Sequence, residues 1–123
     1  MTLQKILIVE DDMIIQMFLS RIIKQAGFDV VGEARSCDQL LEILTTETPD
    51  LILMDIGIVG DKDGVETTAI VNEKYNIPVI FMTGNSDETT LERARKQNPL
   101  TVLFKPIDEG RLKRELFQIR DNA

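Results

Sequence analysis

The sequence predicts an α/β fold in which a parallel sheet is covered by helices on both faces. Four short apolar runs, bounded by turn residues, are typical of strands that are buried on both sides. Segments with helical spacing of apolar residues alternate with these strands, and connections this short require right-handed crossovers. At 123 residues the chain is long enough to bury a core without metals or disulfides, and we expect residues 1–123 to form a single domain.

The first strand and the first helix are expected over residues 5–27. Residues 5–9 form the strand, and Asp12 caps a helix that ends at Gly27. The apolar positions of this helix form a core stripe: Ile15, Phe18, Leu19, Ile22, Ile23 and Ala26. Three apolar side chains fall outside the stripe: Met13, Ile14 and Met17. We interpret them as covering the rim of the sheet, and the alternative is a patch on which a partner docks.

A second strand, a second helix and the central strand come next. Residues 28–34 form a strand near an edge of the sheet, because Gly32 weakens it. Ser36 and Gln39 have the spacing of a capping box at the start of a helix. The central strand, residues 51–55, is apolar until it ends in a carboxylate.

The second half of the chain continues the alternation of helices and strands. In chain order we expect a glycine-rich loop over 56–63, a helix over 65–75, a strand over 79–82, a helix opened by Asn85 or Ser86, a strand over 101–104 and a helix capped by Asp108. The glycines of this loop and at its end, Gly57, Gly60 and Gly64, permit positive φ and close approach of the backbone to a ligand. The apolar positions of the first of these helices are Val65, Ala69, Ile70 and Val71, and those of the last are Leu112, Leu116 and Ile119. The outer face of the middle helix carries Glu92, Arg93, Arg95 and Lys96.

The composition excludes several classes of function. With 14 basic and 21 acidic residues the net charge is −7, the wrong sign for binding nucleic acid through this domain. The chain has no histidine and a single cysteine, Cys37, which we expect to be buried, so zinc binding and Cys-His catalysis are unsupported. No apolar run has the length of a membrane span or of a signal peptide core, and we expect a cytoplasmic protein without membrane contact.

Polar side chains follow four of the predicted strands at the point where each strand ends. Glu10 and Asp11 follow the first strand, Asp55 ends the central one, and Thr83 and Lys105 follow the last two. Ligands bind beyond the carboxyl ends of strands in open α/β sheets, so we expect these five side chains to share one site. Carboxylates this close together stay ionised only beside a cation, and oxygen ligands without His or Cys favour Mg²⁺.

Phosphoryl transfer is the chemistry that this set of residues fits. An ammonium group and a hydroxyl group are suited to phosphoryl oxygens, and a carboxylate can attack a phosphoryl group in line. Each residue alone has a simpler explanation as a helix cap, a turn residue or a surface lysine. Their joint occurrence at the strand ends favours transfer to Asp55. The absence of a G-x-G-x-x-G motif and of a G-x-x-x-x-G-K-[ST] loop disfavours a nucleotide-binding domain.

These motifs resemble, in order and spacing, those of response-regulator receiver domains of two-component signalling. They are Ile8-Val9-Glu10-Asp11-Asp12, Leu53-Met54-Asp55-Ile56, Asp63-Gly64, Phe81-Met82-Thr83-Gly84 and Phe104-Lys105-Pro106. The resemblance, which extends to the chemotaxis receivers, implies a flavodoxin-like doubly wound (βα)5 fold with strand order 2-1-3-4-5. It also implies a signalling domain that is not an enzyme beyond its own phosphorylation and dephosphorylation.

The resemblance assigns a role to each site residue. Asp55 would accept a phosphoryl group from the phosphohistidine of a histidine kinase or histidine phosphotransfer protein. Thr83 and Lys105 would hold the phosphoryl oxygens, and Lys105-Pro106 would be a cis peptide bond. The ligands of Mg²⁺, for which Mn²⁺ or Ca²⁺ could substitute, would be Asp11, Asp55, the backbone carbonyl of Gly57 and, mainly through water, Glu10.

The implied partners are a kinase on one side and an effector domain or protein on the other. No effector region is recognisable in residues 1–123, so we expect the output to lie elsewhere. The segments that flank the site are the candidates for kinase docking: Met13, Ile14, Met17, Pro106 and Ile107. A homodimer through the last two helices stays open, because their mixed charges would look the same on a monomer.

The sequence departs from the receiver pattern in three places. Val102 stands where receivers usually carry a Tyr or Phe that turns inward, so we expect Thr83 to move while the output face reorganises less. The loop after the central strand is one residue longer than the commonest form and has no Pro after Ile58. Gly57 has no side chain to steer a hydrolytic water, whereas Asn85 could do so, and these positions tend to set the phosphoryl lifetime.

Two other functions stay open on the sequence alone. A phosphatase that works through an aspartyl phosphate would use the same nucleophile. Such enzymes usually need a second Asp as an acid near the nucleophile, and Gly57 does not supply one. A pseudo-receiver would be a docking module that works without phosphorylation, which the complete acidic set disfavours.

Overall fold

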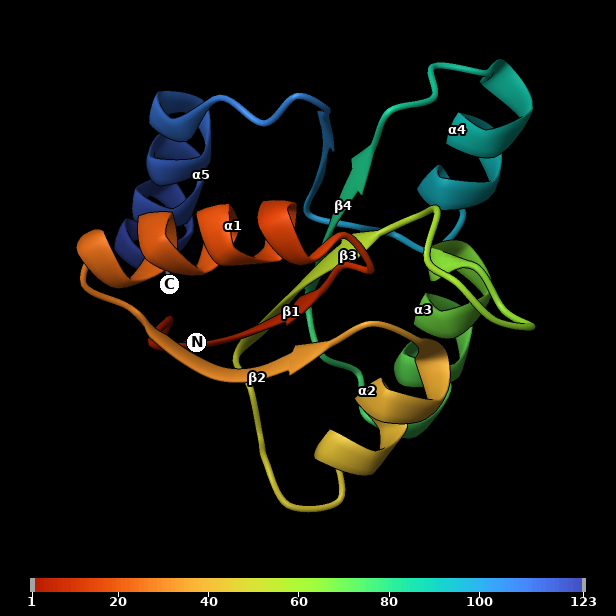
Figure 1. Cartoon of the computed structure of the whole chain (residues 1–123), viewed down its shortest axis with the longest axis horizontal. Coiled ribbons are helices and arrows are strands. Elements are labelled where there is room, and N and C mark those ends of the chain that lie inside the picture. Colours follow the sequence, from red (N-terminus) through yellow and green to blue (C-terminus); the bar gives the residue numbers. More distant parts are fainter. Residues whose placement is uncertain (1, 123) are drawn as a thin grey trace.

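The computed structural model describes residues 2–122 as five strands that alternate with five helices (Figure 1). The elements are β1 (Lys5–Val9), α1 (Met13–Gln25), β2 (Asp29–Ala34), α2 (Cys37–Ile43), β3 (Leu51–Asp55), α3 (Gly64–Lys74), β4 (Val79–Thr83), α4 (Glu88–Arg95), β5 (Thr101–Phe104) and α5 (Glu109–Asp121). All strands are parallel, in the order β2-β1-β3-β4-β5. The predicted flavodoxin-like topology and the edge position of residues 28–34 are confirmed.

The helices cover both faces of the sheet, and each face has its own hydrophobic core. Helices α1 and α5 lie on one face, and α2, α3 and α4 lie on the other (Figure 1). Because side chains alternate along a strand, Ile6 and Ile8 of β1 face the α1–α5 core while Leu7 and Val9 face the opposite core. All five residues of β3 are buried, which explains its continuous apolar run. None of the helices within residues 2–122 has the length and apolar character needed to span a bilayer.

Helix α1 begins and ends where the sequence predicted. The Asp12 side chain accepts hydrogen bonds from the N–H groups of Ile14 and Ile15, and Gly27 adopts a φ of 95° just beyond the C-cap. The three residues outside the core stripe do not cover the rim of the sheet, so that interpretation is wrong. Their exposed fractions are 61% for Met13, 79% for Ile14 and 69% for Met17.

Two predicted helix caps differ from the structure. The Ser36 hydroxyl accepts from Gln39 N–H as expected, but the Gln39 side chain accepts from Arg35 N–H, so the reciprocal half of the capping box is wrong. A complete capping box occurs instead at the start of α3, between Asp63 and Glu66.

Helix α4 is capped by Asp87, not by Asn85 or Ser86. The Asn85 side chain accepts from Asp87 N–H in a turn, which delays the helix by two residues.

The buried face of α3 is more polar than the sequence predicted. Thr67 and Thr68 are buried, whereas Ala69 and Ile70 are only half-buried. The Thr67 hydroxyl is accommodated because it donates to the Asp63 carbonyl at 2.7 Å within the first turn. In α5 the predicted Leu112 and Leu116 are buried, while Ile119 is half-buried against the same core. Cys37 is buried as expected.

Candidate functional site

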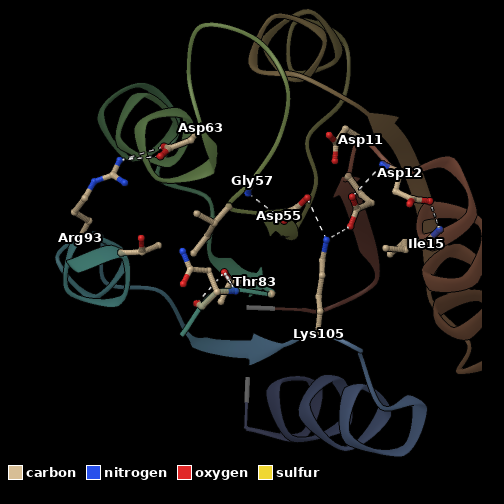
Figure 2. Close-up of a pocket in the computed structure, with 14 residues that line it drawn as sticks. Asp11, Asp12, Ile15, Asp55, Gly57, Asp63, Thr83, Arg93 and Lys105 are labelled. Atoms are coloured by element: carbon tan, nitrogen blue, oxygen red, sulfur yellow. Dashed lines mark hydrogen bonds and ion pairs between the residues drawn. The ribbon is translucent and has the colours of Figure 1, made fainter. Parts of the chain in front are cut away.

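A cleft of about 670 Å³ lies at the carboxyl ends of β1, β3, β4 and β5. Its lining includes all five side chains that the strand ends were predicted to bring together: Glu10, Asp11, Asp55, Thr83 and Lys105 (Figure 2). Gly57 and Asn85 line the same cleft. The convergence follows from the parallel sheet, since the carboxyl ends of β1, β3, β4 and β5 all point to the same edge of the sheet.

Lys105 joins the two buried carboxylates at the centre of the cleft. Its Nζ lies 2.7 Å from Oε1 of Glu10 and 3.2 Å from Oδ2 of Asp55. Glu10 is 0% exposed and Asp55 is 4% exposed. The remaining oxygens also have donors, because Gly57 N–H donates to Asp55 Oδ1 and Asp12 N–H donates to Glu10 Oε2. The carboxylate of Asp55 therefore has a fixed direction before any ligand binds.

Burial and charge act in opposite directions on these groups. Burial raises the pKa of Glu10 from its ordinary value of 4.5 to about 7, although the hydrogen bond from Lys105 acts to lower that pKa. Burial alone would lower the pKa of Lys105, but its hydrogen bond to Glu10 and the charge of Asp55 outweigh burial and raise that pKa. Lys105 therefore stays a cation at neutral pH, whereas Glu10 changes its charge near pH 7.

The acidic residues of the cleft have the chemistry of a divalent-cation site. One carboxylate oxygen from each of Glu10, Asp11 and Asp55 lies within 4.8 Å of the others. Three carboxylates against one ammonium leave an excess of negative charge, and Glu10 Oε1 has no donor within residues 2–122 besides the Lys105 contact. A small set of oxygen donors with excess negative charge fits Mg²⁺ better than a softer metal.

Gly64 positions the backbone of Asp55. A Cβ atom at residue 64 would lie 2.3 Å from the Asp55 carbonyl oxygen and 2.7 Å from Cα of Ile56. Gly64 N–H donates to the Ile56 carbonyl at 2.7 Å, so α3 starts directly against the end of β3. The sequence pointed to the loop glycines as places where a ligand approaches the backbone. The structure corrects this for Gly64, because the group that approaches is the backbone of Asp55.

Thr83 and Asn85 form the opposite side of the cleft. The Thr83 hydroxyl accepts from Asn85 N–H at 3.0 Å and lies 3.2 Å from the Asn85 carbonyl, to which it donates. Thr83 is buried, while Asn85 is exposed. Val102, on the neighbouring strand, is half-buried and packs against the core under α2, α3 and α4. The Lys105-Pro106 bond is cis, as the resemblance implied.

An ion pair at the rim of the cleft was missed by the sequence reasoning. Arg93, expected on the outer face of α4, is half-buried, and its Nη2 lies 2.9 Å from Oδ2 of Asp63. Both residues line the cleft (Figure 2). The two are 30 positions apart on separate elements, so neither helical spacing nor strand pairing gave a signal for their contact.

The residues proposed for docking are not among those that line the cleft, and they differ in exposure. Met13, Ile14 and Met17 are exposed along α1, and Pro106 is exposed at the end of β5. Ile107 is half-buried and packs against the α1–α5 core. The exposed side chains on α1 and at Pro106 therefore leave a surface on which a partner could bind.

Comparison with known proteins identifies the family. The family model of the response regulator receiver domain matches residues 6–117. The chain belongs to this family. Receiver domains are the signalling modules of two-component response regulators, and they interact with histidine kinases and with effector domains. As a family they bind Mg²⁺ through acidic residues, and this receiver domain has the acidic cluster.

Relatives of this receiver domain occur both as short proteins and as parts of longer ones. Sporulation initiation phosphotransferase F of Bacillus subtilis is 34% identical over 108 residues, which cover 85% of this chain and 84% of that protein. Transcriptional regulatory protein PdtaR of Mycobacterium tuberculosis is 30% identical over 104 residues, and the match spans only half of that protein. The signal receiver domain of a modulated diguanylate cyclase from Desulfovibrio desulfuricans G20 has a TM-score of 0.88 and 32% identity, with 98% and 95% of the two chains covered.

Proposed function

We propose that this receiver domain takes a phosphoryl group onto Asp55 from the phosphohistidine of a histidine kinase or histidine phosphotransfer protein. The observation that carries the proposal is the position of Lys105, whose ammonium contacts the Asp55 carboxylate beside two further acidic side chains. A half-buried lysine held between two carboxylates is well placed to bind an oxygen of the phosphoryl group once that group is attached to Asp55.

In the transfer, an oxygen of Asp55 forms a bond to phosphorus while the bond from phosphorus to the histidine nitrogen breaks. The leaving nitrogen keeps the electron pair, and the ring departs as neutral imidazole because its other nitrogen carries a proton throughout the transfer. No further reactant is consumed. Gly57 N–H holds the other oxygen of Asp55 and so orients the attacking one. Lys105 and the Thr83 hydroxyl offer donors to the phosphoryl oxygens as charge moves onto Asp55.

Glu10, Asp11, Asp55 and the backbone carbonyl of Gly57 would hold Mg²⁺. When bound, the ion neutralises charge between the carboxylates and the phosphoryl oxygens. The acidic cluster, with more carboxylates than cations, supports this assignment.

The proposed cellular role is that of a cytoplasmic signalling domain that is not an enzyme in its own right. Phosphorylation would shift the population between two conformations, and an effector domain or protein would bind one of them. The exposed apolar side chains of α1, with Pro106 beside the cleft, would dock the kinase: Met13, Ile14 and Met17.

Mass spectrometry of the intact protein tests the proposal. With acetyl phosphate and Mg²⁺ we expect the mass of one phosphoryl group to be added to the wild type and to the matched control Asp61→Asn, an exposed loop residue. Asp55→Asn should gain no mass. A wild type that gains no mass would point instead to a docking module that works without phosphorylation, and multiple turnover on a phosphate ester would point to a phosphatase.

A further inference from the structure

The ion pair between Asp63 and Arg93 connects the start of α3 to α4, and the Asn72 amide of α3 donates to Gln97 just beyond the end of α4. Apart from the contacts of Lys105, every other ion pair within residues 2–122 lies inside a single helix. Arg93 is on α4, and Asp63 is the N-cap of α3. The side chains are 41% and 30% exposed, so solvent screens the pair only in part.

Apolar burial contributes little to the position of helix α4. Only two of its eight residues, Leu91 and Ala94, are buried. The other side chains of the helix are polar or charged and contribute little apolar burial. The contact of Arg93 with Asp63 and the hydrogen bonds from Asn72 to Gln97 are therefore the polar contacts that hold α4 to α3.

The Asp63 end of the pair is tied to the phospho-acceptor. Asp63 precedes Gly64, whose Cα lies against the carbonyl of Asp55 without room for a Cβ. The Asp63 side chain also holds Glu66 N–H at 2.9 Å, so its position is fixed by the start of α3. A displacement of the Asp55 backbone and a displacement of α4 would therefore both alter the contact between Asp63 and Arg93.

The Arg93 end of the pair is free to respond to charge in the cleft. Both contacts to Asp63 are made by Nη2, at 2.9 and 3.3 Å, and Nε and Nη1 make no hydrogen bond within the described residues. Arg93, Asp55 and Thr83 line the same cleft, with the guanidinium directed at Asp63 (Figure 2). Phosphorylation would replace the single negative charge of the Asp55 carboxylate by a phosphoryl group of about −2, so the cleft would gain about one negative charge. A guanidinium binds such a group through two donors at once.

We propose that the Asp63–Arg93 ion pair couples the phosphorylation state of Asp55 to the position of α4. In the unphosphorylated domain Arg93 holds α4 to Asp63. The negative charge of a phosphoryl group on Asp55 draws Arg93 away from Asp63, and α4 moves with it. Val102, at the usual position of the mobile aromatic ring, has no ring that could carry the change to this surface. This inference rests on the proposed function of Asp55.

Hydrogen exchange of the α4 amides, with and without acetyl phosphate and Mg²⁺, tests the coupling. In the wild type we expect the exchange rates of α4 to change by about two- to fivefold on phosphorylation, which is the range that a partly exposed ion pair supports. In Arg93→Gln, and in Asp63→Asn, which keeps an acceptor for the helix cap, α4 should exchange faster before phosphorylation. Phosphorylation should then change its rates by less than half as much as in the wild type.

Arg95→Gln is the matched control, because Arg95 pairs with Glu88 inside α4 and does not reach another element. It should respond as the wild type does. Intact mass measured on the same samples gives the phosphorylated fraction. If all variants gain the phosphoryl group and Arg93→Gln keeps the full change in α4, the coupling is overturned and phosphorylation of Asp55 stands. If the wild type gains no mass, both proposals are overturned.

Discussion

The two sides of the cleft are held in place by different means. On the β1–β3 side, Glu10 and Asp55 are buried, share Lys105 and are fixed by backbone donors. On the β4–α4 side, the Thr83 hydroxyl bonds only to the backbone of Asn85 among residues 2–122, and α4 buries two side chains. The difference separates the residues that react from the segment that is expected to move. The group that reacts is fixed by the core, whereas the segment that could report the reaction is weakly packed and free to move.

Gly64→Ala should produce the largest effect, because it acts on the rigid side of the cleft. The new Cβ would overlap the Asp55 carbonyl, so the start of α3 or the end of β3 must shift. We expect the free energy of unfolding to fall by about 2–3 kcal/mol, as for severe overpacking, and phosphorylation to slow with it. Gly84→Ala is the matched control, since a Cβ there meets nothing within 4 Å. Equal midpoints for the two variants in urea would show that the two sides are packed alike.

Glu10 should make the stability of the metal-free protein depend on pH. Its pKa is about 7 in the folded protein and near 4.5 when unfolded, so between these values the folded state binds more protons. The contribution of Glu10 to the free energy of unfolding is therefore largest below about pH 4.5. This contribution falls as the pH rises to about 7 and is constant above that pH. The fall amounts to about 3 kcal/mol. Urea titrations in the presence of a chelator measure it.

Glu10→Gln should remove this fall, whereas Glu33→Gln, at an exposed position, should keep it. The same proton opposes cation binding, so the affinity for Mg²⁺ should rise with pH until about pH 7 and be constant above it. A pH-independent affinity would contradict the raised pKa that burial gives Glu10.

Asp87→Ala tests the looser side, where we expect a smaller effect. Asp87 caps α4 through Thr90 N–H at a long 3.4 Å, so its loss should cost about 1 kcal/mol or less. The cost should appear as faster hydrogen exchange confined to α4, with the amides of β3 unchanged. Exchange that rises equally in β3 would mean that α4 and the central strand unfold together.

Met17→Ser should change stability least of all. Because the side chain is 69% exposed, we expect the midpoint of thermal unfolding to stay within the error of the measurement. If α1 docks the kinase, phosphotransfer from a phosphorylated kinase should slow, while phosphorylation by acetyl phosphate should proceed at the wild-type rate. Equal slowing with both donors would contradict a role in docking.

The strand ends were predictable from the sequence, and the rim of the cleft was not. Four apolar runs that end in Glu10-Asp11, Asp55, Thr83 and Lys105 place these residues at one edge of any parallel sheet, so topology alone brings them together. The cap at Asp87 and the contact of Arg93 depend on the path of a loop and on side-chain reach across two elements. Local spacing carries no information about either of them.

The amphipathic pattern predicted the cores better than it predicted polar burial. In the stripe of α1, Leu19, Ile22 and Ile23 are buried and the other three residues are half-buried against the same core. Gln16, which the stripe does not include, is also buried and donates to the carbonyls of Glu10 and Ala34. A buried amide is stable there because two strand-end carbonyls need a donor, which the pattern of apolar residues cannot reveal.

Chemical localisation of the phosphoryl group tests the central claim most directly. Borohydride reduces an aspartyl phosphate to homoserine, so peptides from protein treated with acetyl phosphate and Mg²⁺ can be sequenced by mass spectrometry. The account predicts homoserine at position 55 alone, and none when Mg²⁺ is chelated. Homoserine at position 11 or 63, or its absence from every aspartate of a protein that gained phosphoryl mass, would contradict the assignment of Asp55.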